Sequence, residues 1–233
     1  MFVCVAGKND ISVNVLQTLF EKKDKNYELG IICNQNETGK DSWQKSLRFY
    51  ARKCGIREYT LQEIYQMKEL VFFSMEFDQI LKPERFIDAR FYNIHFSLLP
   101  KYRGMYTSAL PILYGEKQSG VTLHRIDRGI DTGDIIAQKV IEIGEEDTSR
   151  DLYLECIEKG TQLVIEYMDV LLKGTESAIP QEKLGATYFG RNAIDYSNLQ
   201  IDLRKTAYQI KNQIRAFCFP EYQYPKVFGK DIE

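Results

Sequence analysis

Short apolar runs alternate with amphipathic segments along the first 175 residues of the chain. The runs have the length of buried strands and lie at residues 2–6, 29–33, 70–73, 91–96, 120–126 and 134–143. The segments between them predict helices at 10–20, 41–55, 105–114 and 149–173, with shorter ones after Thr60 and near Pro83. Pro111 would kink or shorten the helix at 105–114. Strands that alternate with helices predict an α/β fold, with a mostly parallel sheet covered on both faces.

The pattern changes near residue 186. A segment of extended character, TYFGRNAIDYS, is broken by Gly190, and the chain ends in an irregular tail rich in aromatic residues. Between them, five apolar residues follow helical spacing and predict one buried helix face: Leu203, Ala207, Ile210, Ile214 and Phe217. We therefore expect a main domain over residues 1–185 and a small appended α+β subdomain over residues 186–233.

Composition narrows the class of protein. The 233 residues include 31 Lys and Arg against 33 Asp and Glu, and the net charge of −2 argues against binding nucleic acid or an anionic membrane through bulk charge. No apolar run approaches the ~18 residues of a membrane span, and the first residues lack the basic start of a signal peptide. The five cysteines form no C-x-x-C pair, which argues against a zinc ribbon or a dithiol site. We expect reduced, mostly buried cysteines and a cytoplasmic protein.

Asn93 and His95 stand two residues apart in the predicted strand YNIHF. Side chains two apart on a strand point to the same side, so the amide and the imidazole should converge near the carboxyl end of the strand, where ligands of open α/β sheets gather. An amide donor beside an imidazole suits a reaction that builds negative charge on a carbonyl oxygen and moves a proton. The alternative is a core histidine satisfied by a backbone carbonyl, with the asparagine as a turn former.

A second polar cluster lies in the segment LHRIDRGIDTGDI. It holds one histidine and three aspartates, with two glycines that allow a tight loop between strands: His124, Asp127, Asp131, Asp134, Gly129 and Gly133. A carboxylate in such a loop could orient a nearby imidazole or accept a proton through water. The alternative is an ordinary acidic turn, and the loop lacks the ligand density of a calcium site.

Taken together, the two clusters resemble the formyltransferase family that uses 10-formyltetrahydrofolate. The sequence NIHFSLLPKYRG, followed 36 residues after His95 by DTGDI, carries the resemblance, which covers roughly residues 1–175. The family acts on methionyl-tRNA, glycinamide ribonucleotide and sugar nucleotides, and it includes a formyltetrahydrofolate hydrolase. The resemblance implies an enzyme of Rossmann-like fold whose domain 1–185 is catalytic, with Asn93, His95 and Asp131 as the catalytic residues and no metal.

The resemblance also implies a place for the folate co-substrate. In the family, the pterin ring lies against a segment upstream of the catalytic asparagine and against the loop that leads to the aspartate. These segments contain six candidate contacts here: Phe77, Asp78, Ile80, Leu81, Asp127 and Ile130. Backbone groups would bind the pterin edge while the apolar side chains cover its faces. The alternative for the apolar residues is simple core packing.

Several features bear on which amine accepts the formyl group. The first turn, AGKNDIS, has a single glycine, which is unlike the phosphate-binding turn of the ribonucleotide enzyme. A short appendage and a net charge of −2 count against tRNA, and the regulatory domain typical of the hydrolase is not present. The chain looks most like enzymes that formylate dTDP-linked amino-dideoxy sugars for O-antigen and other surface polysaccharides, with the amine on carbon 3 or carbon 4. The alternatives are methionyl-tRNA or a UDP-aminosugar as acceptor, or a non-catalytic folate- or nucleotide-binding module, which would be expected to have lost a catalytic residue.

A dTDP-sugar requires charge for its pyrophosphate and a flat partner for thymine. The loop after the catalytic strand supplies Tyr102, Arg103 and Gly104, and the tail supplies Tyr222. These are the expected substrate contacts, with the alternative that the rings only cap the core or an interface. The segment 186–233 offers more apolar surface than it can cover, so we also expect a homodimer that uses it.

Overall fold

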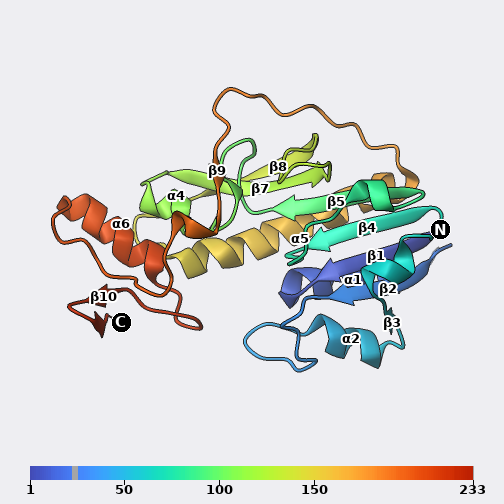
Figure 1. Ribbon diagram of the computed structural model, residues 1–233, viewed down its shortest axis with the longest axis horizontal. Helices are drawn as coiled ribbons and strands as arrows, with labels where there is room; N and C mark the ends of the chain where they lie inside the picture. The colour runs from blue at the N-terminus through green and yellow to red at the C-terminus, as the bar shows by residue number, and fades with distance from the viewer. Residues whose placement is uncertain (23–25, 233) are drawn as a thin grey trace. The chain divides into compact units, whose positions relative to one another are not determined.

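The computed structural model describes residues 1–22 and 26–232, and its centre is a seven-stranded sheet (Figure 1). The strand order is β3-β2-β1-β4-β5-β7-β8. The strands are β1 (Phe2–Gly7), β2 (Glu28–Cys33), β3 (Arg57–Glu58), β4 (Leu70–Met75), β5 (Ala89–His95), β7 (Gln118–Arg125) and β8 (Ile135–Glu142). The pairs from β3 through β5 are parallel, whereas β7 runs antiparallel to β5. This confirms the predicted α/β fold with a mostly parallel sheet.

The chain contains helices at most of the predicted places. They are α1 (Asn9–Glu21), α2 (Leu47–Lys53), α3 (Leu61–Ile64), α4 (Leu110–Leu113), α5 (Ser149–Lys173), α6 (Ala207–Phe217) and the 3-10 helices η1 (Pro83–Arg85) and η2 (Arg191–Ala193). Helix α3 begins with the predicted capping box, in which Thr60 and Glu63 bond each other's backbone N–H groups. No helix in the described part of the chain is long and apolar enough to cross a membrane.

Two helices begin later than predicted. Helix α2 starts after Ser46, whose hydroxyl accepts from the Phe49 N–H and caps the first turn, so residues 41–45 stay outside the helix. Helix α4 contains only the residues around Pro111, because proline is accommodated in a first turn but not in a helix interior. The predicted helix over 105–114 is therefore wrong for its first half.

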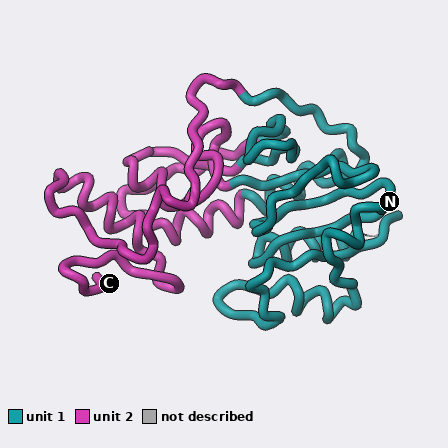
Figure 2. Tube along the Cα trace, in the orientation of Figure 1, with its two compact units in different colours: residues 1–95, 122–137, 160–181 teal, residues 96–121, 138–159, 182–233 magenta. Residues whose placement is uncertain are grey.

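The chain divides into two compact units (Figure 2). Unit 1 contains residues 1–95, 122–137 and 160–181, and unit 2 contains residues 96–121, 138–159 and 182–233. Residues 182–233 thus pack with two earlier segments, and the predicted boundary after residue 185 stays a prediction. Unit 2 also holds two short strand pairs: β6 (Arg103–Gly104) pairs with β9 (Tyr188–Phe189), and β10 (Lys226–Val227) pairs with β11 (Lys230–Asp231).

In unit 1, the two faces of the sheet are packed differently around β5. On one face, Tyr92 is buried and its hydroxyl donates to the Leu171 carbonyl of α5. On the other face, Phe91 belongs to an apolar cluster with residues of β1, β2 and β4, among them Cys4, Ile32 and Phe72. Because side chains alternate along a strand, Asn93 and His95 extend from the same face as Phe91.

Helix α6 in unit 2 buries a different face from the one predicted. Leu203 precedes the helix and is 49% exposed, and Ile210 and Ile214 are only half-buried, so of the predicted face only Phe217 is buried. The buried side holds Asn212 and Arg215. The Arg215 guanidinium donates to the carbonyls of Gly144 and Asp147 and to the Asn212 side chain. These loop carbonyls require hydrogen-bond donors, and the polar side chains are buried because they supply them. The spacing of apolar residues along the chain gives no information about this requirement.

Candidate active site

The carboxyl end of β5 positions the first two predicted catalytic residues. Asn93 is half-buried and His95 is 7% exposed, and both extend from the face opposite Tyr92, as the strand alternation predicts. The strand ends at His95, so the imidazole lies at the edge of the sheet where the parallel strands β1 and β4 also end. Ligands of open α/β sheets bind at this edge.

The loop between β7 and β8 brings in the third residue, Asp131. Its backbone has a φ of 53°, an unusual conformation for a residue other than glycine, and several contacts hold the loop in shape. The Asp127 carboxylate accepts from the Gly129 N–H and the Thr132 hydroxyl. A side chain at Gly133 would meet the Arg125 carbonyl oxygen, so only glycine allows this approach.

A long-range hydrogen-bond clamp also fixes this loop. The Gln181 side-chain amide donates to the carbonyls of Asp131 and Gly133, at 2.9 and 2.7 Å. Two further links tie the same segments together: Ile135 pairs with Ile179, and the Arg125 guanidinium forms an ion pair of 2.8 Å with Glu176. The sequence offered no signal for Gln181, because the contact depends on where the chain returns after α5.

The three predicted catalytic residues come together in unit 1. The Asp131 carboxylate has one oxygen 3.5 Å from Nδ1 of His95 and the other 3.7 Å from Nε2 of His124. Both His95 and Asp131 are largely buried, so their interaction is weakly screened by solvent. The carboxylate is placed to orient His95 and to stabilise positive charge on its ring.

His124 is the member of the site whose role the sequence did not reveal. It lies directly opposite Asn93 in the β5–β7 pair and is 2% exposed. Its Nε2 is 3.0 Å from the Asn93 amide nitrogen and its Nδ1 is 2.7 Å from the Arg125 carbonyl oxygen. Burial, with a smaller contribution from His95, lowers the pKa of His124 to about 4, so the ring is neutral at physiological pH.

This arrangement supports acyl-group chemistry without a nucleophilic side chain. Asn93 can donate to an oxygen that becomes negative, and His95 can take a proton with the support of Asp131. All five cysteines are free thiols, and burial raises the pKa of Cys33 to about 12, which leaves that thiol unreactive. Among the described residues, no group of His, Cys, Asp and Glu side chains is placed to hold a metal ion.

The residues predicted to contact the folate lie in unit 1 with the catalytic group, but they differ in exposure. Ile80 is 73% exposed and Ile130 is 41% exposed, whereas Leu81 is buried in the cluster around Phe91, and Phe77 packs at its border. Asp78 is exposed, and its carboxylate accepts from the Gln35 N–H. Their predicted contacts with folate stay predictions, and Ile80 and Ile130 are the apolar members that a ligand can reach.

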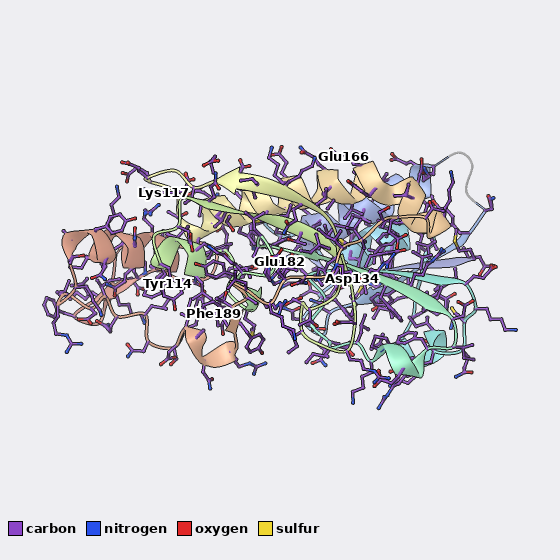
Figure 3. All side chains as sticks on the ribbon, turned by 90° about the horizontal axis from the view of Figure 1, so that it is seen from above. Tyr114, Lys117, Asp134, Glu166, Glu182 and Phe189 are labelled. Carbon is purple, nitrogen blue, oxygen red and sulfur yellow. The ribbon has the colours of Figure 1, made fainter. Side chains whose placement is uncertain are left out.

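The residues predicted to contact the sugar nucleotide lie in unit 2. Tyr102 is buried, stacks on Phe189 at 5.5 Å and donates its hydroxyl to Glu116. Phe189 is labelled in Figure 3. Gly104 approaches the Phe189 carbonyl so closely that a Cβ would clash with it. Arg103 is half-buried in β6, and Tyr222 is exposed with its ring 5.0 Å from Phe219. Packing within unit 2 is thus enough to explain why a tyrosine stands at position 102 and a glycine at position 104. The side chains of Arg103 and Tyr222 remain accessible to a ligand.

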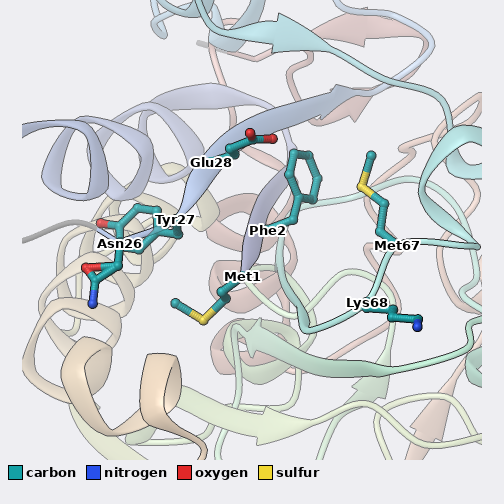
Figure 4. Close-up of a pocket in the computed structure, with 7 residues that line it drawn as sticks. All are labelled: Met1, Phe2, Asn26, Tyr27, Glu28, Met67 and Lys68. Carbon is teal, nitrogen blue, oxygen red and sulfur yellow. The ribbon is translucent and has the colours of Figure 1, made fainter.

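A pocket of about 550 Å³ in unit 1 is not the catalytic site (Figure 4). Its lining includes Met1 and Phe2 at the start of β1, Glu28 at the start of β2, and Lys68 before β4. These residues mark the amino ends of the strands, whereas Asn93 and His95 lie at the carboxyl ends. The pocket and the catalytic residues are therefore at opposite edges of the sheet.

Comparison with known proteins identifies the class to which this fold belongs. A family model described as Formyl transferase matches residues 3–168, and the chain belongs to this family. The methionyl-tRNA formyltransferase of Fervidobacterium nodosum is 30% identical over 93% of this chain and 71% of its own length.

Two solved structures are more similar in sequence. The N-formyltransferase of Helicobacter canadensis, solved with folinic acid and dTDP-3-aminofucose, is 44% identical, with a TM-score of 0.94 over 99% of this chain and 85% of that chain. WlaRD, a sugar 3N-formyl transferase solved with dTDP and 5-N-formyl-THF, is 43% identical, with a TM-score of 0.94 over 100% of this chain and 84% of that chain. The family resemblance expected from the two sequence clusters is confirmed.

Proposed function

We propose that this protein transfers the formyl group of 10-formyltetrahydrofolate to the amine of a dTDP-linked amino-dideoxy sugar. The observation that carries the proposal is the grouping of Asn93, His95 and Asp131 at the carboxyl edge of the sheet, with His95 and Asp131 3.5 Å apart. The two relatives at 43–44% identity, both solved with a thymidine nucleotide and a formylated folate, support the choice of substrates.

The residues around the catalytic group fit a folate. A pterin is flat and apolar on its faces and hydrogen-bonding along its edge, and such ligands bind where exposed apolar side chains meet backbone donors and acceptors. Ile80 and Ile130 supply the exposed apolar surface, and the backbone of residues 127–131 supplies the polar groups. When bound there, the folate supplies an activated formyl group; the reaction requires no metal.

The chain's own residues then carry the proton and the charge. Asn93 donates an amide hydrogen to the formyl oxygen as that oxygen becomes negative, a contribution of roughly 3 kcal/mol for one such donor. His95 accepts the proton that the attacking amine loses, directly or through water, and returns a proton to the departing nitrogen. Asp131 keeps the imidazole oriented and stabilises its positive charge while it holds the proton.

We further propose that the accepting amine is on carbon 3 of the sugar. The two relatives at 43–44% identity support this choice, because one was solved with dTDP-3-aminofucose and the other is a sugar 3N-formyl transferase. A 4-N formyltransferase from Francisella tularensis is only 20% identical to this chain. The reaction would take place in the cytoplasm, and its product would be used to assemble a surface polysaccharide such as an O-antigen.

A substrate panel tests this proposal. Purified protein is incubated with 10-formyltetrahydrofolate and, in separate reactions, dTDP-3-amino and dTDP-4-amino dideoxy sugars, a UDP-4-aminosugar and methionyl-tRNA. Mass spectrometry should detect a gain of one formyl group on a dTDP-3-aminosugar, with kcat/KM at least about a hundredfold above the other acceptors. Preferred formylation of another acceptor would identify that acceptor instead, and binding without turnover of any would indicate a non-catalytic module.

For the nucleotide we propose contacts in unit 2, from the loop of Tyr102, Arg103 and Gly104 and from Tyr222. Arg103 carries the positive charge that a pyrophosphate requires, and Tyr222 offers an accessible ring face for thymine. Tyr102 and Gly104 set the conformation of the loop that holds Arg103. Tyr222→Ala should raise KM for the dTDP-sugar by about tenfold and leave KM for the folate within twofold.

A pocket in unit 2 offers a competing place for the nucleotide. It has a volume of about 430 Å³, within the usual range for small-ligand sites, and its lining includes Tyr106, Arg191 and Tyr196. The rings of Tyr106 and Tyr196 are 4.9 Å apart, and Arg191 adds a cation. If Arg191→Ala raises KM for the dTDP-sugar while Tyr222→Ala does not, the nucleotide binds in this pocket and the proposed role of Tyr222 is wrong.

We also propose that two copies of the chain form a dimer through residues 186–233. Helix α6 leaves Ile210 and Ile214 half-buried, and the nearby Leu203 is exposed. Apolar surface of this kind on a small segment is typical of an interface. Sedimentation at micromolar concentration should give a dimer, and Ile210→Glu should shift it to a monomer. Ile165→Glu, an exposed position on α5 in unit 1, is the matched control and should remain dimeric.

A further inference from the structure

The hydrogen bonds around His124 determine which ring nitrogen carries the hydrogen. Nδ1 lies 2.7 Å from the Arg125 carbonyl oxygen, which can only accept, so Nδ1 must carry the hydrogen of the neutral ring. Nε2 then has a lone pair and no hydrogen. Its neighbour at 3.0 Å must donate, and the side chain of Asn93 can do so only through its amide nitrogen.

The environment keeps this ring neutral. His124 is almost fully buried, and His95, whose ring centroid is 6.4 Å away, adds an unfavourable charge whenever both rings are protonated. The Asp131 carboxylate acts in the opposite direction, but its nearer oxygen is 3.7 Å from Nε2, beyond hydrogen-bond distance. Asp127 also favours the protonated ring, and its carboxylate is already bound to Gly129 and Thr132.

We infer that His124 is a positioning residue that fixes the orientation of the Asn93 amide. This inference rests on the proposed function, in which Asn93 donates to the formyl oxygen. With one amide hydrogen bound to Nε2, the amide nitrogen stays beside the His124 ring, and its second hydrogen can point to the reacting oxygen. A reversed amide would set its oxygen against the Nε2 lone pair, and the donor for the formyl oxygen would be lost.

The tautomer can be measured in the unaltered protein. The chain has only two histidines, so ¹⁵N-histidine labelling gives two ring spectra, and His95→Asn assigns them by removing one. The inference requires that His124 be neutral at pH 7 with its hydrogen on Nδ1. A ring that is protonated, or that carries its hydrogen on Nε2, overturns it, and this readout does not depend on formyl transfer.

Kinetics test whether His124 acts through Asn93. His124→Leu, which cannot accept from the amide, should lower kcat by about 10- to 100-fold with both KM values nearly unchanged, while His124→Gln, which offers an oxygen acceptor, should keep kcat within about tenfold of the parent. In an Asn93→Ala background, His124→Leu should cost no further activity, because the group it positions is gone. An equal loss in both backgrounds, or full activity in His124→Leu, overturns the inference. Failure of the proposed function is separate and would be seen as no formyl transfer by the parent protein.

Discussion

Replacing Asp131 with asparagine tests the central claim about the catalytic group, because it removes a charge and keeps the size of the side chain. In the proposed mechanism His95 gains a positive charge during the reaction, and the Asp131 carboxylate lies 3.5 Å from its Nδ1. At an effective dielectric constant of about 20, two unit charges at this distance attract by about 5 kcal/mol, and in bulk water by only about 1 kcal/mol. The two side chains are 8% and 15% exposed, which places the pair nearer the first value.

These values set the expected loss of activity. At 1.36 kcal/mol for each tenfold change in rate, ~5 kcal/mol corresponds to a few thousandfold, and ~1 kcal/mol to less than tenfold. The asparagine keeps a hydrogen-bond acceptor and recovers part of the interaction, so we expect Asp131→Asn to lower kcat by about 100- to 1,000-fold. KM for both substrates should change little, because the stabilised charge exists only during the reaction.

The assay is initial-rate formyl transfer from 10-formyltetrahydrofolate to the preferred dTDP-aminosugar, with the product quantified by mass spectrometry. Asp169→Asn is the matched control: Asp169 is an exposed carboxylate on α5 in an ion pair with Lys22, and its loss should leave kcat unchanged. A loss of less than tenfold in folded Asp131→Asn protein would show that the carboxylate acts through a solvent-screened interaction, and the proposed support of His95 would be wrong.

Three further predictions concern the groups that hold this site in place. Gln181→Ala removes both donors that clamp the Asp131 loop and should lower kcat by about tenfold at steady state, with a small change in melting temperature. Gly133→Ala brings a methyl group onto the Arg125 carbonyl oxygen, so both stability in urea and kcat should fall. The pKa of His124 is lower in the folded protein, about 4, than in the unfolded chain, about 6.5, so the unfolded chain binds more protons between these values and stability should fall as pH falls. The loss between pH 7 and pH 5 is about 2 kcal/mol, and His124→Gln should reduce this slope in urea titrations at the two pH values.

The grouping of the candidate catalytic residues could be predicted in part because two of them are local in sequence. Asn93 and His95 share a strand, and strand alternation alone places them on one face. Asp131 joins them through the register that sets Asn93 opposite His124 and through a loop held by Gln181. Neither the strand register nor the Gln181 hydrogen bonds can be predicted from the local spacing of residues. The assignment of Asp131 to the site came from the resemblance to a known family.

The errors in the predicted helices have a common physical cause. The start of α2 is set by the Ser46 cap, and the start of α4 by Pro111, whereas the sequence pattern, through the start residues Asp41 and Ser42 in the first case, placed both starts nearer the amino terminus. For α6, spacing identified a helix correctly but not the face that is buried. The carbonyls of Gly144 and Asp147 require a donor, and Arg215 satisfies them at the cost of leaving apolar residues near the surface.

The two histidines of this chain show why residue type alone does not assign a catalytic role. Both lie at the same edge of the sheet, in adjacent strands, with their rings 6.4 Å apart. His95 has a carboxylate beside Nδ1, a partner that stabilises a protonated ring, and so it is suited to carry a proton during the reaction. His124 has a backbone carbonyl beside Nδ1 and an amide beside Nε2, partners that stabilise a neutral ring of one fixed tautomer. In the proposed mechanism the same side chain therefore serves as a proton carrier in one position and as a fixed acceptor in the other, and its partners decide which.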